Sequence, residues 1–107
     1  MEIEALLQEL ADDTALEPFR ALIEPLKEHD RTRRSDLVRT LRTYFAAGTN
    51  ASEAADRLFL HRNSMLYRLE RIQNLTGLDL KDGRVALALQ LGLLAHERGE
   101  RNATQHP

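Results

Sequence analysis

The chain contains no cysteine and no tryptophan, and only 5% of its 107 residues are aromatic. The lack of cysteine excludes disulfide frameworks, thiolate zinc sites and cysteine nucleophiles. Long hydrophobic runs are lacking too, since the longest apolar stretch, Val85–Ala95, falls far short of the roughly 20 residues that span a bilayer. No basic and then apolar segment follows Met1, so we expect no export signal, no membrane segment and a cytoplasmic protein.

Signs of a metal site or of catalysis are equally scarce. The four histidines have no metal-ligand spacing such as i, i+4 on one helix, so we expect no metal and no cofactor. They are His29, His61, His96 and His106. The acid pairs Asp12-Asp13 and Asp79/Asp82 are better explained as loop and capping residues than as a carboxylate site. Because the chain has no recognisable nucleophile–base pair or phosphate-binding glycine loop, we do not expect an enzyme.

Leucine and alanine supply most of the apolar content, whereas valine is scarce. This composition favours helices packed on helices, and 107 residues suffice for about one hydrophobic core. We therefore predict an all-α fold, a small helical domain of about five to six helices.

Charge is unevenly distributed. The total is −2, but residues 1–30 hold nine acids and two bases, a net charge of −7. Residues 31–75 hold nine arginines and four acids, a net charge of +5, and residues 76–107 are balanced. The positive middle segment suits a nucleic-acid partner, although a solvated arginine-rich surface would give the same count.

The first 34 residues are expected to form an N-terminal helical segment or linker. Apolar residues at i, i+3, i+4 and i+7 predict a helix from Ile3 to Ala11. Pro18 suits the first turn of a second helix, and Pro25 should kink or stop that helix near Ile23 or Glu24. The polar stretch 27–34 is interpreted as a connector.

Residues 35–97 carry stronger helix signals. One helix should start at Ser35 or Asp36 and stop at Gly48, and a short one should follow, with Asn50 as its N-cap. The next helix should cover about 62–75. The last, from Asp82 or Gly83 to about 97, contains leucines that alternate as in a strand, but its residues are helix formers. We expect a frayed polar tail at 98–107.

The pair of helices around residues 50–75 has the form of a helix-turn-helix. Ala54, Ala55 and Leu58 should face inward from the first helix, and Met65, Leu66, Leu69 and Ile72 from the second. Ser64, Tyr67, Arg68 and Arg71 fall on the opposite side of the second helix. Residues near the N-terminus of a recognition helix enter the major groove first. Our candidate DNA-binding residues are Ser52, His61, Arg62, Asn63, Ser64, Tyr67, Arg68 and Arg71.

Each of these residues also has a structural interpretation. Asn50 and Tyr67 can be a helix cap and a packing aromatic, and Arg68 and Arg71 can form a solvated face. Arg57 and Arg62 can pair with nearby acids. The predicted turn also lacks the glycine that many such turns contain.

The string H-R-N-S-M-L-Y-R-L at 61–69, followed by L-T-G-L-D-L at 75–80, resembles the C-terminal helix-turn-helix of PucR-type regulators. More loosely it is similar to Fis-type helix-turn-helix proteins. Ser64 stands where threonine is usual in the family, and Leu66 where a basic or polar residue is frequent. The resemblance implies a DNA-binding module behind a sensory domain, with Arg62, Asn63, Ser64, Tyr67 and Arg68 at the DNA.

We therefore expect a sequence-specific DNA-binding domain at 35–97 of a bacterial transcription regulator, bound to double-stranded DNA as a homodimer. Any small-molecule effector would bind a domain absent from this chain, of which 1–34 would be a linker or remnant. The alternative is a helical protein–protein interaction module without DNA binding.

Overall fold

The structure, a computed structural model, describes residues 2–105, with side chains described through residue 97. Over that range it is helical and contains no strand, which confirms the predicted all-α class. Seven α-helices and one short 3-10 helix occur there, against the five to six helices predicted. Their bounds are α1 Ile3–Ala11, η1 Thr14–Leu16, α2 Glu17–Ala21, α3 Glu24–Arg33, α4 Leu37–Ala46, α5 Ala51–Arg57, α6 Arg62–Thr76 and α7 Gly83–Gln105.

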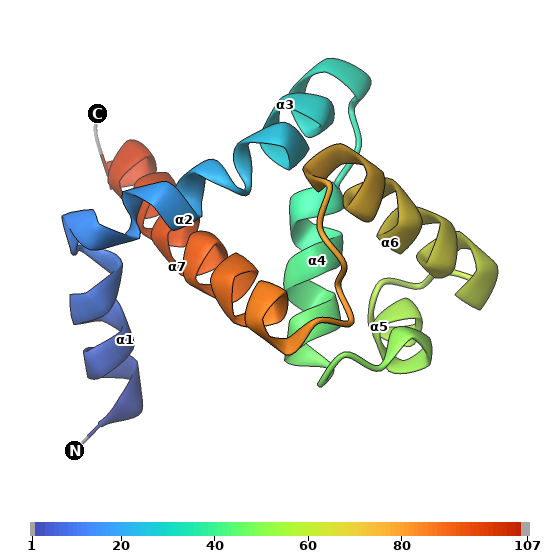
Figure 1. Cartoon of the computed structure of the whole chain (residues 1–107), viewed down its shortest axis with the longest axis horizontal. Helices are drawn as coiled ribbons and strands as arrows, with labels where there is room; N and C mark the ends of the chain where they lie inside the picture. The colour runs from blue at the N-terminus through green and yellow to red at the C-terminus, as the bar shows by residue number, and fades with distance from the viewer. Residues whose placement is uncertain (1, 106–107) are drawn as a thin grey trace.

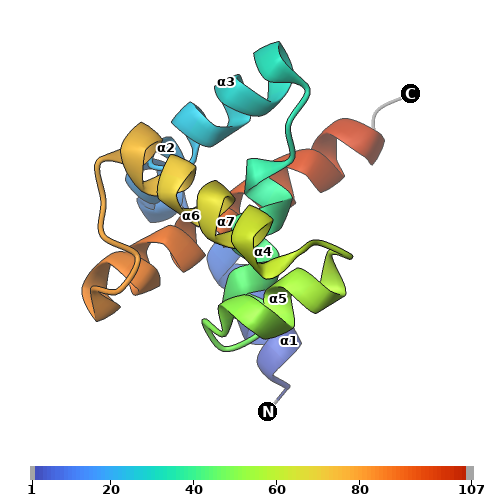
Figure 2. The same cartoon turned by 90° about the vertical axis from the view of Figure 1, so that its right-hand side faces the viewer.

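The helices form two groups that meet at α4 (Figure 1). On one side α1 and α2 pack on α7, and on the other side α5 packs on α6. α3 bridges the two groups and contacts both α4 and α6. Seen from the side, α5 and α6 lie in front of α4 (Figure 2). The core draws on both groups and includes Ile23, Leu26, Leu37, Leu41, Ala54, Met65, Ile72 and Leu89.

The N-terminal helices differ in part from the prediction. α1 has the predicted bounds, and Pro18 lies in the first turn of α2, as expected. α2 stops before Pro25, as expected, but Pro25 lies in the first turn of a new helix, α3, which covers most of the stretch 27–34 predicted to be a polar connector. The periodicity of apolar residues did not predict this helix, because α3 buries only one side chain, Leu26. The helix is stabilised by packing against α4 and α6.

The junction between α3 and α4 is held by one carboxylate. Asp30 accepts hydrogen bonds from the backbone amides of Leu37, at 2.7 Å, and Val38, at 3.0 Å, and from the Ser35 hydroxyl at 2.5 Å. It therefore caps α4 from the preceding helix. Asp36, the residue at the N-cap position itself, makes no side-chain capping bond, so its carboxylate is left for another contact.

The helix-turn-helix begins as the sequence predicted. Gly48 follows α4 with a φ of 66°, and the Asn50 side chain accepts a hydrogen bond from the Glu53 amide at 3.0 Å. The Glu53 carboxylate accepts a hydrogen bond from Arg57, one turn later, at 2.9 Å. Ala54 and Ala55 of α5 are buried, and Leu58 is partly buried, which confirms the predicted inward face.

The turn after α5 closes in a left-handed conformation without glycine. The Leu60 amide donates to the Ala55 carbonyl at 2.9 Å and the Phe59 amide donates to the Asp56 carbonyl at 3.2 Å, the bond pattern of a Schellman motif. Phe59 takes the position that glycine usually fills, with a φ of 56° and a side chain 95% exposed. The motif therefore forms at a cost in backbone strain.

The two long helices follow the prediction closely at their starts. α6 ends at Thr76, within one residue of the predicted end, and Gly77 follows it with a φ of 72°. α7 is helical, as predicted, because Leu89 and Leu93 are buried four residues apart while Leu87 is exposed. It continues to Gln105 through most of the tail that we expected to be frayed, and residues 106–107 lie outside the described range. Within the described residues, no helix has the length and hydropathy needed to cross a bilayer.

Replacing Phe59 by glycine should stabilise the fold by about 1 kcal/mol, because glycine adopts positive φ without the Cβ clash. The free energy of unfolding, measured with urea, tests this. Phe59→Ala is the matched control: it also removes the exposed ring but keeps the Cβ, so it should show no such gain. Equal stabilities for the two variants would contradict the strain argument.

Candidate nucleic-acid interface

One stripe of α6 is open to solvent along the length of the helix. Asn63, Tyr67, Glu70 and Asn74 are all exposed and recur at helical spacing. On the opposite side Met65 and Ile72 are fully buried, and Leu69 is partly buried. The helix thus locks onto the domain by one side and presents polar groups on the other, as a groove-reading helix must.

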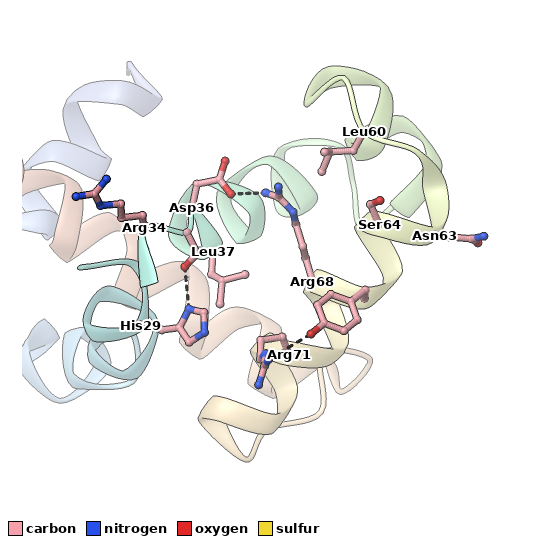
Figure 3. A pocket seen from close by; sticks show the side chains of 11 residues that line it. His29, Arg34, Asp36, Leu37, Leu60, Asn63, Ser64, Arg68 and Arg71 are labelled. Atoms are coloured by element: carbon pink, nitrogen blue, oxygen red, sulfur yellow. Dashed lines mark hydrogen bonds and ion pairs between the residues drawn. The ribbon is translucent and has the colours of Figure 1, made fainter. Parts of the chain in front are cut away.

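The N-terminal ends of α5 and α6 are tied together at the surface. The guanidinium Nε of Arg62 donates to the hydroxyl of Ser52, in the first turn of α5, at 3.1 Å. His61 caps α6, since its Nδ1 accepts a hydrogen bond from the Asn63 amide at 3.0 Å. The Asn63 side chain points away from the body of the domain (Figure 3). All these side chains are exposed, as the sequence analysis required of DNA-contacting groups.

Tyr67 and Arg71 form an exposed pair one turn further along. Tyr67 is 62% exposed, and Arg71 donates a hydrogen bond to its hydroxyl at 3.2 Å. The Arg71 guanidinium carbon also lies 5.9 Å from the centre of the Tyr67 ring. The tyrosine thereby holds the arginine in place, and the pair keeps a positive charge at the surface.

Arg68 does not share that free position. Its guanidinium donates to the Asp36 carboxylate and, at 3.2 Å, to the Thr40 hydroxyl, so it bridges α6 to α4 (Figure 3). Thr40 is fully buried and also donates to the Asp36 carbonyl at 2.9 Å. The expectation that Arg68 lies on the solvent face with Arg71 therefore needs correction: its side chain is 29% exposed and turned toward α4.

The inward prediction for Leu66 also needs correction, because its side chain is 40% exposed. At about 100° per residue, the exposed stripe is rotated roughly 80° from the face that residue types alone suggested. The rotation carries Arg68 inward and Leu66 outward. Residue type alone places an arginine in solvent. The Asp36 carboxylate that accepts from Arg68 lies 32 residues away in the sequence, so a local pattern could not indicate this contact.

A cleft of about 760 Å³ lies between the α3–α4 junction and α6 (Figure 3). Besides the predicted Asn63, Ser64, Tyr67, Arg68 and Arg71, it is lined by residues that the sequence analysis did not place at the site: His29, Arg34, Ser35, Asp36, Leu37 and Leu60. His29 and Ser35 are 2.8 Å apart through Nδ1 and Oγ. For the side of the cleft formed by the α3–α4 junction, the sequence offered one indication, the arginines within 31–34.

At the end of α3, Glu28 raises the pKa of Arg31 by accepting a hydrogen bond from it and by its charge. Arg31 is therefore firmly cationic. Arg57 donates to the Glu53 carboxylate at 2.9 Å, as one of the structural interpretations anticipated, whereas Arg62 donates to the Ser52 hydroxyl.

These groups are suited to binding rather than to catalysis. Guanidinium and carboxamide groups donate to base edges and phosphates, and a helix of this diameter fits a major groove roughly 12 Å wide. No cluster of three or more His, Asp or Glu side chains that could hold a metal ion lies within the part of the chain described by the structure. Fold and surface together define a helix-turn-helix domain.

Comparison with known proteins identifies the kind of regulator. Residues 37–95 match the PucR C-terminal helix-turn-helix domain. Since this match covers more than half of the chain, the protein belongs to the PucR family of transcription regulators. The family consists of regulators and not of enzymes, and its helix-turn-helix implies a DNA partner.

Curated relatives agree with this assignment. The chain is 33% identical over 86% of its length to the purine catabolism regulatory protein of Bacillus subtilis, 17% of which is covered. It is 35% identical over 64% of its length to the proline-responsive activator PutR of the same species, with 17% covered. It is 44% identical over 53% of its length to the carbohydrate diacid regulator of Escherichia coli, with 15% covered. The chain thus spans less than a fifth of these relatives. No solved structure matches it.

Arg68→Ala should lower the free energy of unfolding by about 2 kcal/mol, because it removes hydrogen bonds between charged and polar groups that join α6 to α4. Arg71→Ala is the matched control, since Arg71 is exposed on the same helix and its loss should cost less than about 0.5 kcal/mol. Chemical denaturation of both variants measures the difference. Similar losses would mean that the bridge to Asp36 adds little to stability.

Proposed function

We propose that this chain is a sequence-specific DNA-binding domain that places α6 in the major groove of its operator. The observation that carries the proposal is the exposed stripe of α6, with Asn63 near its N-terminus and Tyr67 and Arg71 one and two turns further along. The +5 charge of residues 31–75 supports it, because that segment surrounds the stripe while the acids concentrate at the N-terminus.

Within this proposal the eight candidate residues divide by role. Asn63 and Arg71 read base edges, where asparagine suits adenine and arginine suits guanine. Hydroxyl and cationic groups around them contact phosphates and fix the register, namely Ser52, His61, Arg62, Ser64 and Tyr67. Arg68 acts as a positioning residue through Asp36 and Thr40, since its donors are used within the domain.

We further propose that the protein binds as a homodimer in the cytoplasm. Two-fold symmetry would place two copies of α6 about one DNA turn, roughly 34 Å, apart. An exposed apolar surface could support self-association. It consists of Ile3, Leu6, Leu7 and Leu10 of α1 and Leu87 of α7. The same surface is the observation that favours the alternative, a protein–protein interaction module.

The domain boundaries are also part of this proposal. Residues 35–97 form the DNA-binding domain, 98–107 a tail, and 1–34 a segment that leads toward a sensory domain upstream. A small-molecule effector would act through that sensory domain. Leu26 of α3 is in the same core cluster as Leu37 of α4, so the end of this segment packs on the DNA-binding domain.

Selection of bound sequences from random duplexes should yield an inverted repeat with half-site centres about 10 base pairs apart. Affinity for the selected duplex should fall steeply between about 50 and 200 mM salt, because arginine–phosphate contacts release counterions. The selected sequences give the half-site spacing, and fluorescence anisotropy measures the affinity at each salt concentration. Failure to bind any duplex at low salt would support the protein-partner alternative, and unpaired half-sites would contradict the dimer.

Asn63→Ala should weaken binding to the selected operator by about 5- to 160-fold, the equivalent of about 1–3 kcal/mol for losing a bidentate base contact. Binding to random duplex should change little, because phosphate contacts persist. Gln90→Ala, on the exposed side of α7, is the control and should bind the operator like the parent. An equal loss of affinity for both kinds of duplex would assign Asn63 to the phosphates instead.

A further inference from the structure

We propose that Leu66 is a specificity residue of the same interface, and that it reads thymine by packing against the 5-methyl group in the major groove. This inference rests on the proposed function, because it names one base type within the operator. A leucine has no hydrogen bond to offer, so its contribution to recognition can only come from apolar contact. The 5-methyl of thymine is the apolar group that the major groove displays.

The position of Leu66 on α6 supports this role. Its side chain is 40% exposed, while Met65 beside it is completely buried. It lies one turn after Asn63, and adjacent in sequence to Tyr67, on the half of the helix that enters the groove first. Leu66 lies at the edge of the exposed face of α6, next to the partly buried Leu69, and its exposed part gains burial only if a partner covers it.

The charges beside Leu66 indicate that it faces bases rather than phosphates. Glu70, one turn further along, is exposed and would repel a phosphate placed against both side chains. Arg62, one turn earlier, donates to Ser52 at the surface, where the first turn of α5 meets the start of α6. Leu66 therefore lies between a cation one turn earlier and an acid one turn later on α6, a setting that favours contact with a base over contact with a phosphate.

The alternative is that Leu66 only completes the packing around α6. It lines a cleft of about 670 Å³ together with Tyr44, Leu69 and Leu80. Tyr44 and Leu80 are buried, however, and Leu69 is partly buried, whereas Leu66 keeps two-fifths of its surface in solvent. Packing explains its buried part and leaves the exposed part for a ligand.

The test replaces thymidine by deoxyuridine, one position at a time, in the duplex selected by the parent protein. This change deletes the methyl group and leaves the hydrogen-bonding edges of the base intact. At one thymidine per half-site, the parent should bind about fourfold more weakly, the equivalent of ~0.8 kcal/mol for one buried methyl-sized group. Leu66→Ala should bind the thymidine and deoxyuridine duplexes equally.

Three controls separate the outcomes. Leu66→Met keeps an apolar side chain of similar size and should keep the discrimination, which covers the case in which the alanine variant folds poorly. Leu87→Ala removes an exposed leucine from α7 and should discriminate like the parent. Leu66→Arg, put through the same selection, should change the preferred base at that position, with guanine the expected replacement.

The result distinguishes this inference from the function it rests on. If the parent selects an operator but no deoxyuridine position separates it from Leu66→Ala, then the Leu66 inference is wrong and the DNA-binding proposal stands. If the parent selects no sequence and binds no duplex, the DNA-binding proposal itself fails.

Discussion

The interface depends on one polar bridge, from Arg68 of α6 to Asp36 and Thr40 of α4. Apolar packing by Met65 and Ile72 holds α6 against the core, but apolar contacts are non-directional and do not by themselves fix the rotation of the helix about its own axis. A guanidinium bonded to a carboxylate and a hydroxyl is directional, so it specifies one rotation. That rotation turns Asn63 and Tyr67 outward.

The bridge in turn requires that two acids, Asp30 and Asp36, accept hydrogen bonds from different partners. Asp36 stands at the N-cap of α4, where its carboxylate would ordinarily accept from backbone amides. Asp30 of α3 accepts those hydrogen bonds instead, from Leu37 and Val38. The carboxylate of Asp36 is thereby left for Arg68. α3 thus contributes to the orientation of a helix that follows it by about 30 residues, although its own sequence has little apolar pattern.

The helix-turn-helix contains both a strained residue and an exposed apolar one. Phe59 holds a left-handed conformation in the turn that sets the angle between α5 and α6, and Leu66 leaves apolar surface in solvent on α6. Stable folds tend to remove such features, whereas binding sites retain them when a partner compensates the cost. The rest of the described core is ordinary close packing of leucine, isoleucine and alanine.

The sequence by itself determined the helical class, the limits of α1, the starts of the helices from α4 to α7, the Asn50 cap and the family, because these follow from short-range periodicity, capping chemistry and a local motif. Only the tertiary structure decided that 24–33 is a helix, that Arg68 turns inward, that Leu66 turns outward and that a cleft joins α3 to α6. The physical reason is that each of these features depends on a partner far away in the sequence. The type of a residue indicates which groups it can bond to, but only the tertiary structure brings one particular partner close to it.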